Sequence, residues 1–187
     1  GPTLAGIVVI FGVFLVVLAI LAGANNPGSS NQSNVVMEIT WTDANNVDHT
    51  GKIWIEFYDD ETPMHAESFR ANAEADRYDG TIFHRIVDGF MIQGGDFENG
   101  DGSGGHAIIW DGYCNGEPKA SSSDCPADQW TIGDEANNGL IHTPCSISMA
   151  KTEYANTGGS QFFLIPEDSN NGQGPNWLDE VHTVFGQ

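Results

Sequence analysis

Residues 78–97, YDGTIFHRIVDGFMIQGGDF, decide how this sequence folds. The stretch holds two runs rich in β-branched and aromatic residues, 81–87 (TIFHRIV) and 89–97 (GFMIQGGDF). Glycines interrupt the second run and separate it from the first. Such a pattern predicts short strands joined by tight turns. Arg85, one of only six cationic residues in the chain, lies inside the first run.

Strand-like runs continue on both sides of this stretch. Upstream, 35–41 (VVMEITW) and 52–58 (KIWIEFY) alternate apolar and polar residues around a turn-rich segment, which predicts a hairpin. A helix is expected from Pro63, with Thr62 as its N-cap. Downstream runs are 145–150 (CSISMA), 160–165 (SQFFLI) and 182–186 (HTVFG). Many short strands and few helices indicate a mainly β fold, either a barrel or a sandwich.

The central stretch also carries a specific resemblance. FHRIVDGFMIQGG (83–95) is similar to the signature of the cyclophilin-type peptidyl-prolyl cis-trans isomerases. SMA (148–150), GGSQFF (158–163) and NWLDEVHTVFG (176–186) follow in the order of that family, so the resemblance covers about 36–187. It implies a cyclophilin-like closed β-barrel with flanking helices. Because family members continue with another strand and a C-terminal helix, we expect this domain to lack both.

The implied chemistry is rotation about X-Pro bonds, which needs no metal and no cofactor. The barrier is about 18–20 kcal/mol, and unaided rotation takes tens to hundreds of seconds. The resemblance makes Arg85 the catalytic residue, whose guanidinium stabilises the twisted prolyl amide. Because one charge-assisted hydrogen bond contributes only about 1.5–3 kcal/mol, water exclusion and positioning must supply the rest.

The resemblance also assigns the substrate-binding positions. An apolar proline pocket is expected from Phe90, Met91, Phe163 and Leu178, with Trp177 and His182 beside it. The other expected groove residues are Gln93, Gly102, Ala150, Lys151 and Gln161. Without the resemblance, the apolar residues could be ordinary core, the glutamines buried amides, and Arg85 part of a surface ion pair. His84 is expected to form structural hydrogen bonds, since isomerisation transfers no proton.

Three departures from the family pattern affect the groove. Lys151 stands where the family commonly has asparagine, and it could alter which residues are accepted before proline. Insertions at 114–125 and 168–176 flank the expected groove, so we expect them to modulate substrate access.

The three cysteines comprise one candidate disulfide pair and one single residue. Cys114 and Cys125 could close a small loop as a disulfide, with two free thiols as the alternative. Cys145 lies in a strand-like run and is expected to be a small buried residue rather than a nucleophile.

The N-terminal segment 4–24 is an unbroken apolar run without charge or proline. Its length suits a transmembrane helix, and a cleaved secretory signal ending near 22–24 is the alternative. Segment 25–35 is a flexible linker, followed by the domain at 36–187. Either reading places the domain outside the cytoplasm, membrane-anchored or secreted.

Net charge and residue spacing argue against nucleic acid, zinc and calcium as ligands. The 187 residues have a formal net charge of -20, which disfavours nucleic-acid binding because phosphate affinity needs clustered Lys and Arg. The histidines show no zinc-ligand spacing. The acidic segment 96–105 lacks the alternating ligands of a calcium loop and is read as a glycine-rich turn.

Together these features predict a monomeric prolyl isomerase that assists folding of extracytoplasmic proteins. Its expected partners are proline-containing polypeptides and, through Trp177, cyclosporin-type ligands. The alternative is a non-catalytic chaperone or scaffold module that holds Pro-containing segments in the same groove.

Overall fold

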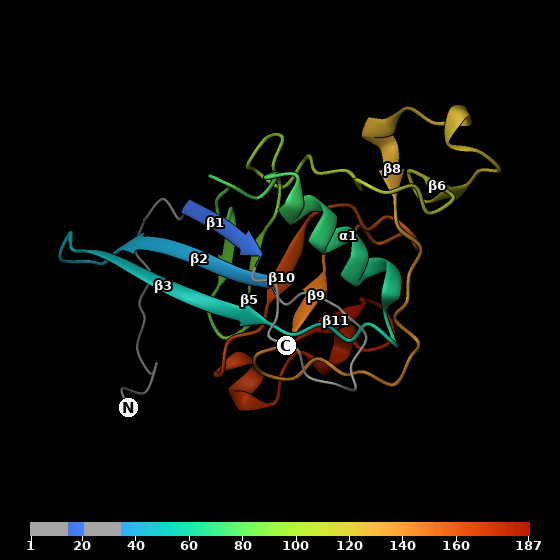
Figure 1. Ribbon diagram of the computed structural model, residues 1–187. Helices are drawn as coiled ribbons and strands as arrows, with labels where there is room; N and C mark the ends of the chain where they lie inside the picture. Colours follow the sequence, from blue (N-terminus) through green and yellow to red (C-terminus); the bar gives the residue numbers. More distant parts are fainter. Residues whose placement is uncertain (1–14, 21–34) are drawn as a thin grey trace, which may run out of the picture.

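The computed structural model describes residues 15–20 and 35–187. A first antiparallel sheet has β2 (Val35–Thr42) between β1 (Leu15–Ile20) and β3 (Asp48–Ile55). The predicted hairpin is confirmed, and it extends from the body of the molecule (Figure 1, left). Exposed and less exposed residues alternate along β3, as expected for a strand with one solvated face.

A second antiparallel sheet has the order β11-β9-β10-β5-β4. Its strands are β4 (Arg85–Val87), β5 (Met91–Gly94), β9 (Ile147–Met149), β10 (Phe162–Leu164) and β11 (Val184–Gly186). These correspond to the five predicted runs, each shortened: β5, β9 and β10 lie within their runs, and β4 and β11 at the C-terminal ends of theirs. Because side chains alternate between faces, one face of this sheet packs on the core and the other carries Arg85.

The core lies between helix α1 (Pro63–Glu74) and both sheets, since Val35, Met37 and Ile55 of the first sheet belong to it (Figure 1). Phe69 of α1 lies at the centre of an aromatic cluster, with ring centroids 4.9–5.6 Å from its partners. Those partners are Phe57, Tyr78, Phe162 and Phe185. Tilted and edge-to-face rings of this kind add stability beyond the area they bury.

The start of α1 differs from the predicted capping. Thr62 occupies the N-cap position, but its hydroxyl donates to the Tyr58 carbonyl at 2.9 Å and does not cap the helix. The carboxylate of Glu135 accepts the backbone N–H groups of Met64 and His65 instead, at 3.2 and 3.0 Å. A negative charge at this end is favourable to the helix dipole.

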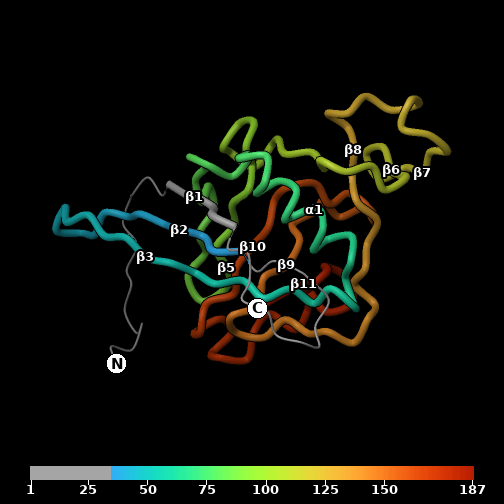
Figure 2. The backbone as a smooth tube through the Cα atoms, in the orientation of Figure 1, coloured from blue at the N-terminus to red at the C-terminus, as the bar shows by residue number. Residues whose placement is uncertain are grey.

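The insertion 114–125 and the residues beside it form a small unit over 113–131, called the insert below. Strands β6 (Tyr113–Cys114), β7 (Glu117–Pro118) and β8 (Trp130–Thr131) make a sheet in the order β7-β6-β8, away from the main body (Figure 2). Cys114 and Cys125 are disulfide-bonded, which confirms that prediction. Short 3-10 helices complete the chain at η1 (Ser122–Asp124), η2 (Ala127–Gln129), η3 (Ser169–Gly172) and η4 (Asn176–Leu178).

The predicted closed barrel is not found in the described part of the chain. The end of β3 joins β11, because Tyr58 N–H donates to the Phe185 carbonyl at 3.0 Å and Glu56 and Gln187 exchange two hydrogen bonds. β1 and β4 are the remaining edges and are not paired with each other. Closure requires hydrogen bonding around the whole ring. The predicted flanking helices reduce to α1 and the short 3-10 turns within residues 15–20 and 35–187.

Two further expectations differ from the structure. Residues 15–20 form β1, paired with β2, where a transmembrane helix was predicted. An apolar run without polar positions has no periodicity to separate a strand from a helix, and here length alone favoured the helix. The rest of 4–24 and segment 25–34 lie outside the described residues, among which no helix is long and apolar enough to cross a membrane. Cys145 is exposed, in a turn with φ of 71°, and not buried as expected.

Candidate active site

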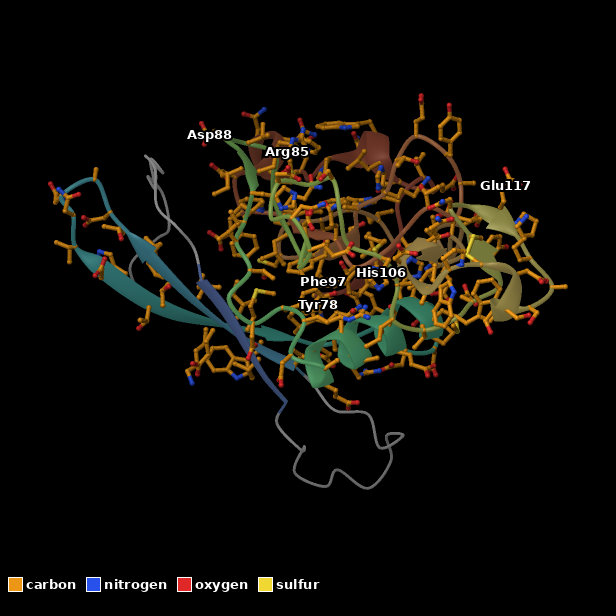
Figure 3. The ribbon with its side chains drawn as sticks, turned by 90° about the horizontal axis from the view of Figure 1, so that it is seen from above. Tyr78, Arg85, Asp88, Phe97, His106 and Glu117 are labelled. Atoms are coloured by element: carbon orange, nitrogen blue, oxygen red, sulfur yellow. A yellow bond between two sulfur atoms is a disulfide. The ribbon has the colours of Figure 1, made fainter. Side chains whose placement is uncertain are left out.

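The strand register brings the predicted catalytic residue beside its expected partners. Arg85 pairs with Gln93, Gln93 with Phe163, and Phe163 with Ser148 along one row of the second sheet. Directly opposite residues share a face, so these side chains lie together. Figure 3 shows Arg85 on the side of the molecule away from α1.

The guanidinium of Arg85 is exposed and engages neutral partners. Its Nη1 donates to Gln93 Oε1 at 3.2 Å and lies 3.9 Å from Met91 Sδ. No carboxylate of the described residues lies within ion-pairing distance of it. The alternative of a surface ion pair is therefore wrong for this part of the chain. Its donors remain available to a carbonyl or amide brought into the groove.

An apolar cluster lies next to Arg85, at the position of the expected proline pocket. Met91, Phe163 and Ile165 are buried together, and Phe90, Ala150 and Leu178 pack against them. Trp177 is at the rim, 57% exposed, with its ring centroid 5.6 Å from that of Phe90. Ile165 was missed, although its spacing of two from Phe163 places it on the same face. The apolar composition of this cluster suits contact with a proline ring.

His182 lies on the other side of Phe163, with ring centroids 5.7 Å apart in an edge-to-face arrangement. Its Nδ1 is 3.0 Å from the Met149 carbonyl oxygen, so this nitrogen must carry the proton. Burial lowers the pKa of His182, partly offset by this hydrogen bond. The side chain is therefore a neutral, oriented donor at neutral pH.

Gln161 joins the row to the groove-edge loop. Its Oε1 accepts from Gln93 Nε2 at 2.9 Å, while its Nε2 donates to the carbonyls of Gly102 and Gly104 at 3.0 and 2.7 Å. These bonds hold its amide between Gln93 and the loop, and its role in lining the groove stays a prediction. Arg85, Gln93 and Gln161 thus form one continuous polar edge beside the apolar pocket.

The groove-edge loop is folded around one buried carboxylate. Asp96 is 1% exposed and accepts five backbone N–H bonds, from Glu98, Asn99, Asp101, Gly102 and Gly104. Burial acts to raise its pKa, but these bonds outweigh burial and lower the pKa to about 2. Asp96 thus holds Gly102 in place within the segment 96–105, which was predicted to be a glycine-rich turn. Among the described residues no acidic or histidine cluster could hold a metal ion.

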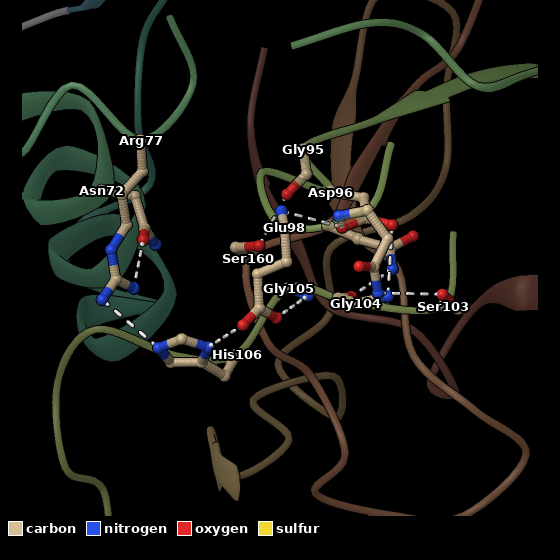
Figure 4. A network of polar contacts seen from close by, with 12 residues as sticks. Asn72, Arg77, Gly95, Asp96, Glu98, Ser103, Gly104, Gly105, His106 and Ser160 are labelled. Atoms are coloured by element: carbon tan, nitrogen blue, oxygen red, sulfur yellow. Dashed lines mark hydrogen bonds and ion pairs between the residues drawn. The ribbon is translucent and has the colours of Figure 1, made fainter. Parts of the chain in front are cut away.

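A second polar chain supports the loop from behind (Figure 4). Arg77 donates to His106 Nε2 at 3.3 Å, so Nδ1 carries the proton and donates to Glu98 at 3.1 Å. Glu98 also accepts the Gly105 N–H at 2.6 Å. His106 and Glu98 were not predicted, because nothing in their local sequence indicates that Arg77 lies beside them.

The first insertion borders this end of the groove. A cavity of about 340 Å³ lies between the groove-edge loop and the insert. Its lining includes Glu98, His106, Asp128, Trp130 and Tyr154. Of the insertion 114–125 only Asn115 lines this cavity, so the effect of the insertion on substrate access stays a prediction.

Two predicted groove residues behave differently from expectation. The Lys151 side chain is only 5% exposed; its Nζ donates to the Tyr154 carbonyl at 3.1 Å and lies 3.4 Å from Asp134. It therefore holds the following loop and does not point into the groove. Both ring nitrogens of His84 are buried, without a well-aligned hydrogen bond to a described residue, so the expected hydrogen-bonding role is not confirmed. Burial lowers the pKa of His84.

Comparisons with known proteins agree with this geometry. Residues 37–187 match the family model described as cyclophilin type peptidyl-prolyl cis-trans isomerase/CLD. Peptidyl-prolyl cis-trans isomerase 9 of Schizosaccharomyces pombe is 35% identical over 89% of this chain, which spans only 22% of that protein. Peptidyl-prolyl cis-trans isomerase-like 1 of Rhizopus delemar is 36% identical, covering 73% of this chain and 67% of its own length.

A solved structure gives the same result for the fold. It is a crystal structure of a Cryptosporidium parvum cyclophilin type peptidyl-prolyl cis-trans isomerase in the presence of the dipeptide Ala-Pro. The TM-score is 0.56 at 27% identity, covering 73% of this chain and 72% of that one. On this evidence, and as the signature predicted, the chain belongs to the cyclophilin-type peptidyl-prolyl cis-trans isomerase family.

Proposed function

We propose that this chain catalyses cis–trans rotation of X-Pro bonds in polypeptides. The observation that carries the proposal is the row Arg85, Gln93 and Phe163 on adjacent strands, which sets a cationic donor beside an apolar pocket. The structural relative crystallised in the presence of Ala-Pro supports the same ligand class.

Each part of the site has a definite role in such a reaction. The pocket of Met91, Phe163 and Leu178 holds the proline ring and keeps the prolyl residue still. The preceding residue then turns about the imide bond. As resonance is lost, the lone pair of the imide nitrogen becomes localised on that atom, and Arg85 donates a hydrogen bond to the twisted amide without transferring a proton.

The energetics require more than the arginine. Millisecond turnover needs about 10⁴–10⁵-fold acceleration, or about 5.5–7 kcal/mol. A charge-assisted hydrogen bond supplies about 1.5–3 kcal/mol of this. The remainder comes from positioning and from the dry pocket wall, where preorganised donors act without solvent reorganisation.

The test is NMR exchange of an Ala-Pro peptide with the parent and three variants. R85A should reduce kcat/KM by about 10- to 150-fold, which corresponds to about 1.5–3 kcal/mol, and R85K should recover only part because it loses the planar fork. K119A removes one exposed cation from the insert and should leave the rate unchanged. Peptide binding without any acceleration by the parent would instead support a non-catalytic Pro-binding module.

The proposed setting is extracytoplasmic, with a role in assisting folding of proline-containing proteins. The disulfide between Cys114 and Cys125 supports an oxidising compartment. The length and apolar composition of 4–24 are typical of an export signal or a membrane anchor, although residues 15–20 pair with β2 as strand β1. Mass determination of the mature N-terminus and protease accessibility on intact cells distinguish these; an inaccessible, reduced protein would contradict the proposal.

Two further expectations remain proposals. Trp177, exposed at the pocket rim, suits a cyclosporin-type ligand, and quenching of its fluorescence on titration would measure binding. A monomer is expected in solution, which sedimentation at several concentrations would check.

A further inference from the structure

A buried polar chain lies directly behind the prolyl pocket, and the reaction described above does not use it. His142, whose side chain is 0% exposed, has Nδ1 2.8 Å from Asp179 Oδ1 and Nε2 2.9 Å from Ser148 Oγ. Ser148 Oγ lies 2.9 Å from the Thr183 carbonyl oxygen. The chain runs from a partly exposed carboxylate to the strand β9 beneath the pocket.

The imidazole of His142 supports the floor of the pocket. Its ring is parallel to that of Phe163, with 4° between the planes and 5.9 Å between centroids. Phe163 is itself only 4% exposed and contributes to the pocket with Met91. A change in the tilt or position of the imidazole must therefore displace the ring of Phe163, because close-packed interiors transmit small displacements.

Asp179 connects the same histidine to the pocket wall. It directly follows Leu178, and its Oδ1 accepts both the backbone N–H and the Nδ1–H of His142, each at 2.8 Å. The preceding loop approaches so closely that a Cβ on Gly174 would clash with the His142 carbonyl oxygen. One carboxylate thus fixes the wall relative to the floor.

We propose that Asp179 and His142 are positioning residues for the prolyl pocket, holding the Leu178 wall against the Phe163 floor at the width of a proline ring. This rests on the proposed isomerase function and names residues for it that make no contact with substrate. Both side chains act through the pocket residues that they support.

The number of hydrogen-bonding protons in the polar chain that links Asp179, His142 and Ser148 makes this positioning sensitive to the protonation of His142. Asp179, when ionised, and the Thr183 carbonyl can only accept, so the three contacts need three protons. A neutral imidazole and the Ser148 hydroxyl supply two, whereas an imidazolium and the hydroxyl supply three. Proton uptake by His142 therefore supplies the third proton, so that all three contacts are hydrogen bonds.

Several groups act on that proton. Burial lowers the pKa of His142, while the hydrogen bond and charge of Asp179 oppose the shift, and a charge on His182 would lower the pKa further. The other neighbours, Ser148 and Phe163, are uncharged. Asp179 is thus the one carboxylate in contact with the ring among the described residues.

The first experiment compares D179N with E180Q by NMR exchange over a range of Ala-Pro peptide concentrations. D179N keeps the shape but removes the charge from the chain; E180Q removes the same charge from the adjacent exposed residue. D179N should raise KM about fivefold with kcat within twofold, because a wider pocket loses binding that is common to ground and transition states. Equal KM values for the two variants would overturn the proposal, as would equal losses of kcat in both.

The second experiment needs no variant in the measured protein. The pKa of His142 is followed by imidazole NMR in the parent, with and without the Ala-Pro peptide, using H142Q only to assign the signal. If the peptide draws the wall inward and shortens the contact to Asp179, it raises the proton affinity of His142 about two- to threefold, and linkage requires the same gain in peptide affinity on acidification.

The outcomes separate the two proposals. A bound peptide that leaves the His142 titration unchanged overturns the positioning role even if the parent is an active isomerase. A shifted titration in a parent without turnover supports the positioning role and contradicts the catalytic function. A peptide that neither binds to the parent nor is isomerised by it would contradict both proposals. D179N should abolish the shift while His182 continues to titrate.

Discussion

Gln161 donates to two carbonyls of the groove-edge loop and accepts from Gln93, so one amide joins the loop to the row that contains Arg85. The three bonds use both ends of the side chain in a fixed orientation. The position of Arg85 relative to Gly102 therefore depends on a residue that the proposed reaction does not require as an acid, a base or a donor to the twisted amide.

Replacing this amide should weaken catalysis more than stability. Q161L removes three hydrogen bonds of about 1 kcal/mol each, but at a part-exposed site where water replaces some of them. We expect kcat/KM to fall about tenfold, because Gln93 and the loop lose their common anchor. NMR exchange and a urea melt measure both quantities. Q173L, at an exposed glutamine, is the control; equal activity in the two variants would contradict the role of Gln161.

The buried carboxylate of Asp96 should make stability fall in acid. Its folded pKa of about 2 lies below the ordinary value of 3.8, so the stabilisation is complete above about pH 4 and is lost as pH falls through 2. The shift corresponds to about 2 kcal/mol.

Thermal melts between pH 6 and pH 1.5 measure this for the parent, D96N and D60N. D96N should melt lower at neutral pH, because its NH₂ group would face backbone donors, and its loss should diminish in acid. D60N, at an exposed aspartate, should follow the parent throughout. A D96N curve parallel to that of the parent down to pH 1.5 would show that the five N–H bonds do not depend on the charge.

Local pattern predicted the strands and their active face better than their closure. The runs around Arg85, Met149 and Phe163 are strands because alternation and turn glycines are local signals. Barrel closure depends on pairing between distant edges, which no local pattern contains, and there the prediction was wrong. Likewise Glu135, which caps α1, is 70 residues from His65 in sequence.

The site divides in the same way. The resemblance selected Arg85, Gln93, Gln161 and Phe163, which the structure brings together, because a signature fixes residues at fixed spacing. It could not give the direction of the Lys151 side chain, which is decided by the position of Asp134. The supporting residues His106 and His142 were missed, because their partners come from other segments.

Breaking the disulfide should loosen the insert and leave the main body folded. The bond between Cys114 and Cys125 closes a loop with a sequence separation of 11, for which the chain-entropy model gives about 3 kcal/mol. That contribution falls on β6, β7 and β8, which form a separate sheet.

Hydrogen exchange of the C114S/C125S double variant measures the effect by region. Amides of the insert, such as Asn115 N–H on the Gln129 carbonyl and Lys119 N–H on the Gly112 carbonyl, should exchange faster. Amides of β9 and β10 should keep their protection. C145S, at the exposed unpaired thiol, is the matched control and should change neither. Loss of protection in β9 and β10 would mean that the insert and body unfold together.

The charge of the chain should make its stability rise with salt. A formal net charge of -20 over 187 residues repels itself in the compact state. Few carboxylates are neutralised, since only six Lys and Arg are present. Raising ionic strength from 0.01 M to 1 M shortens the Debye length from about 30 Å to about 3 Å, which screens this repulsion. We expect the thermal midpoint to increase steadily with NaCl.

Sucrose at equal osmolality separates screening from general exclusion effects. An increase of the same size in sucrose, or a decrease in NaCl, would show that self-repulsion does not limit the folded state.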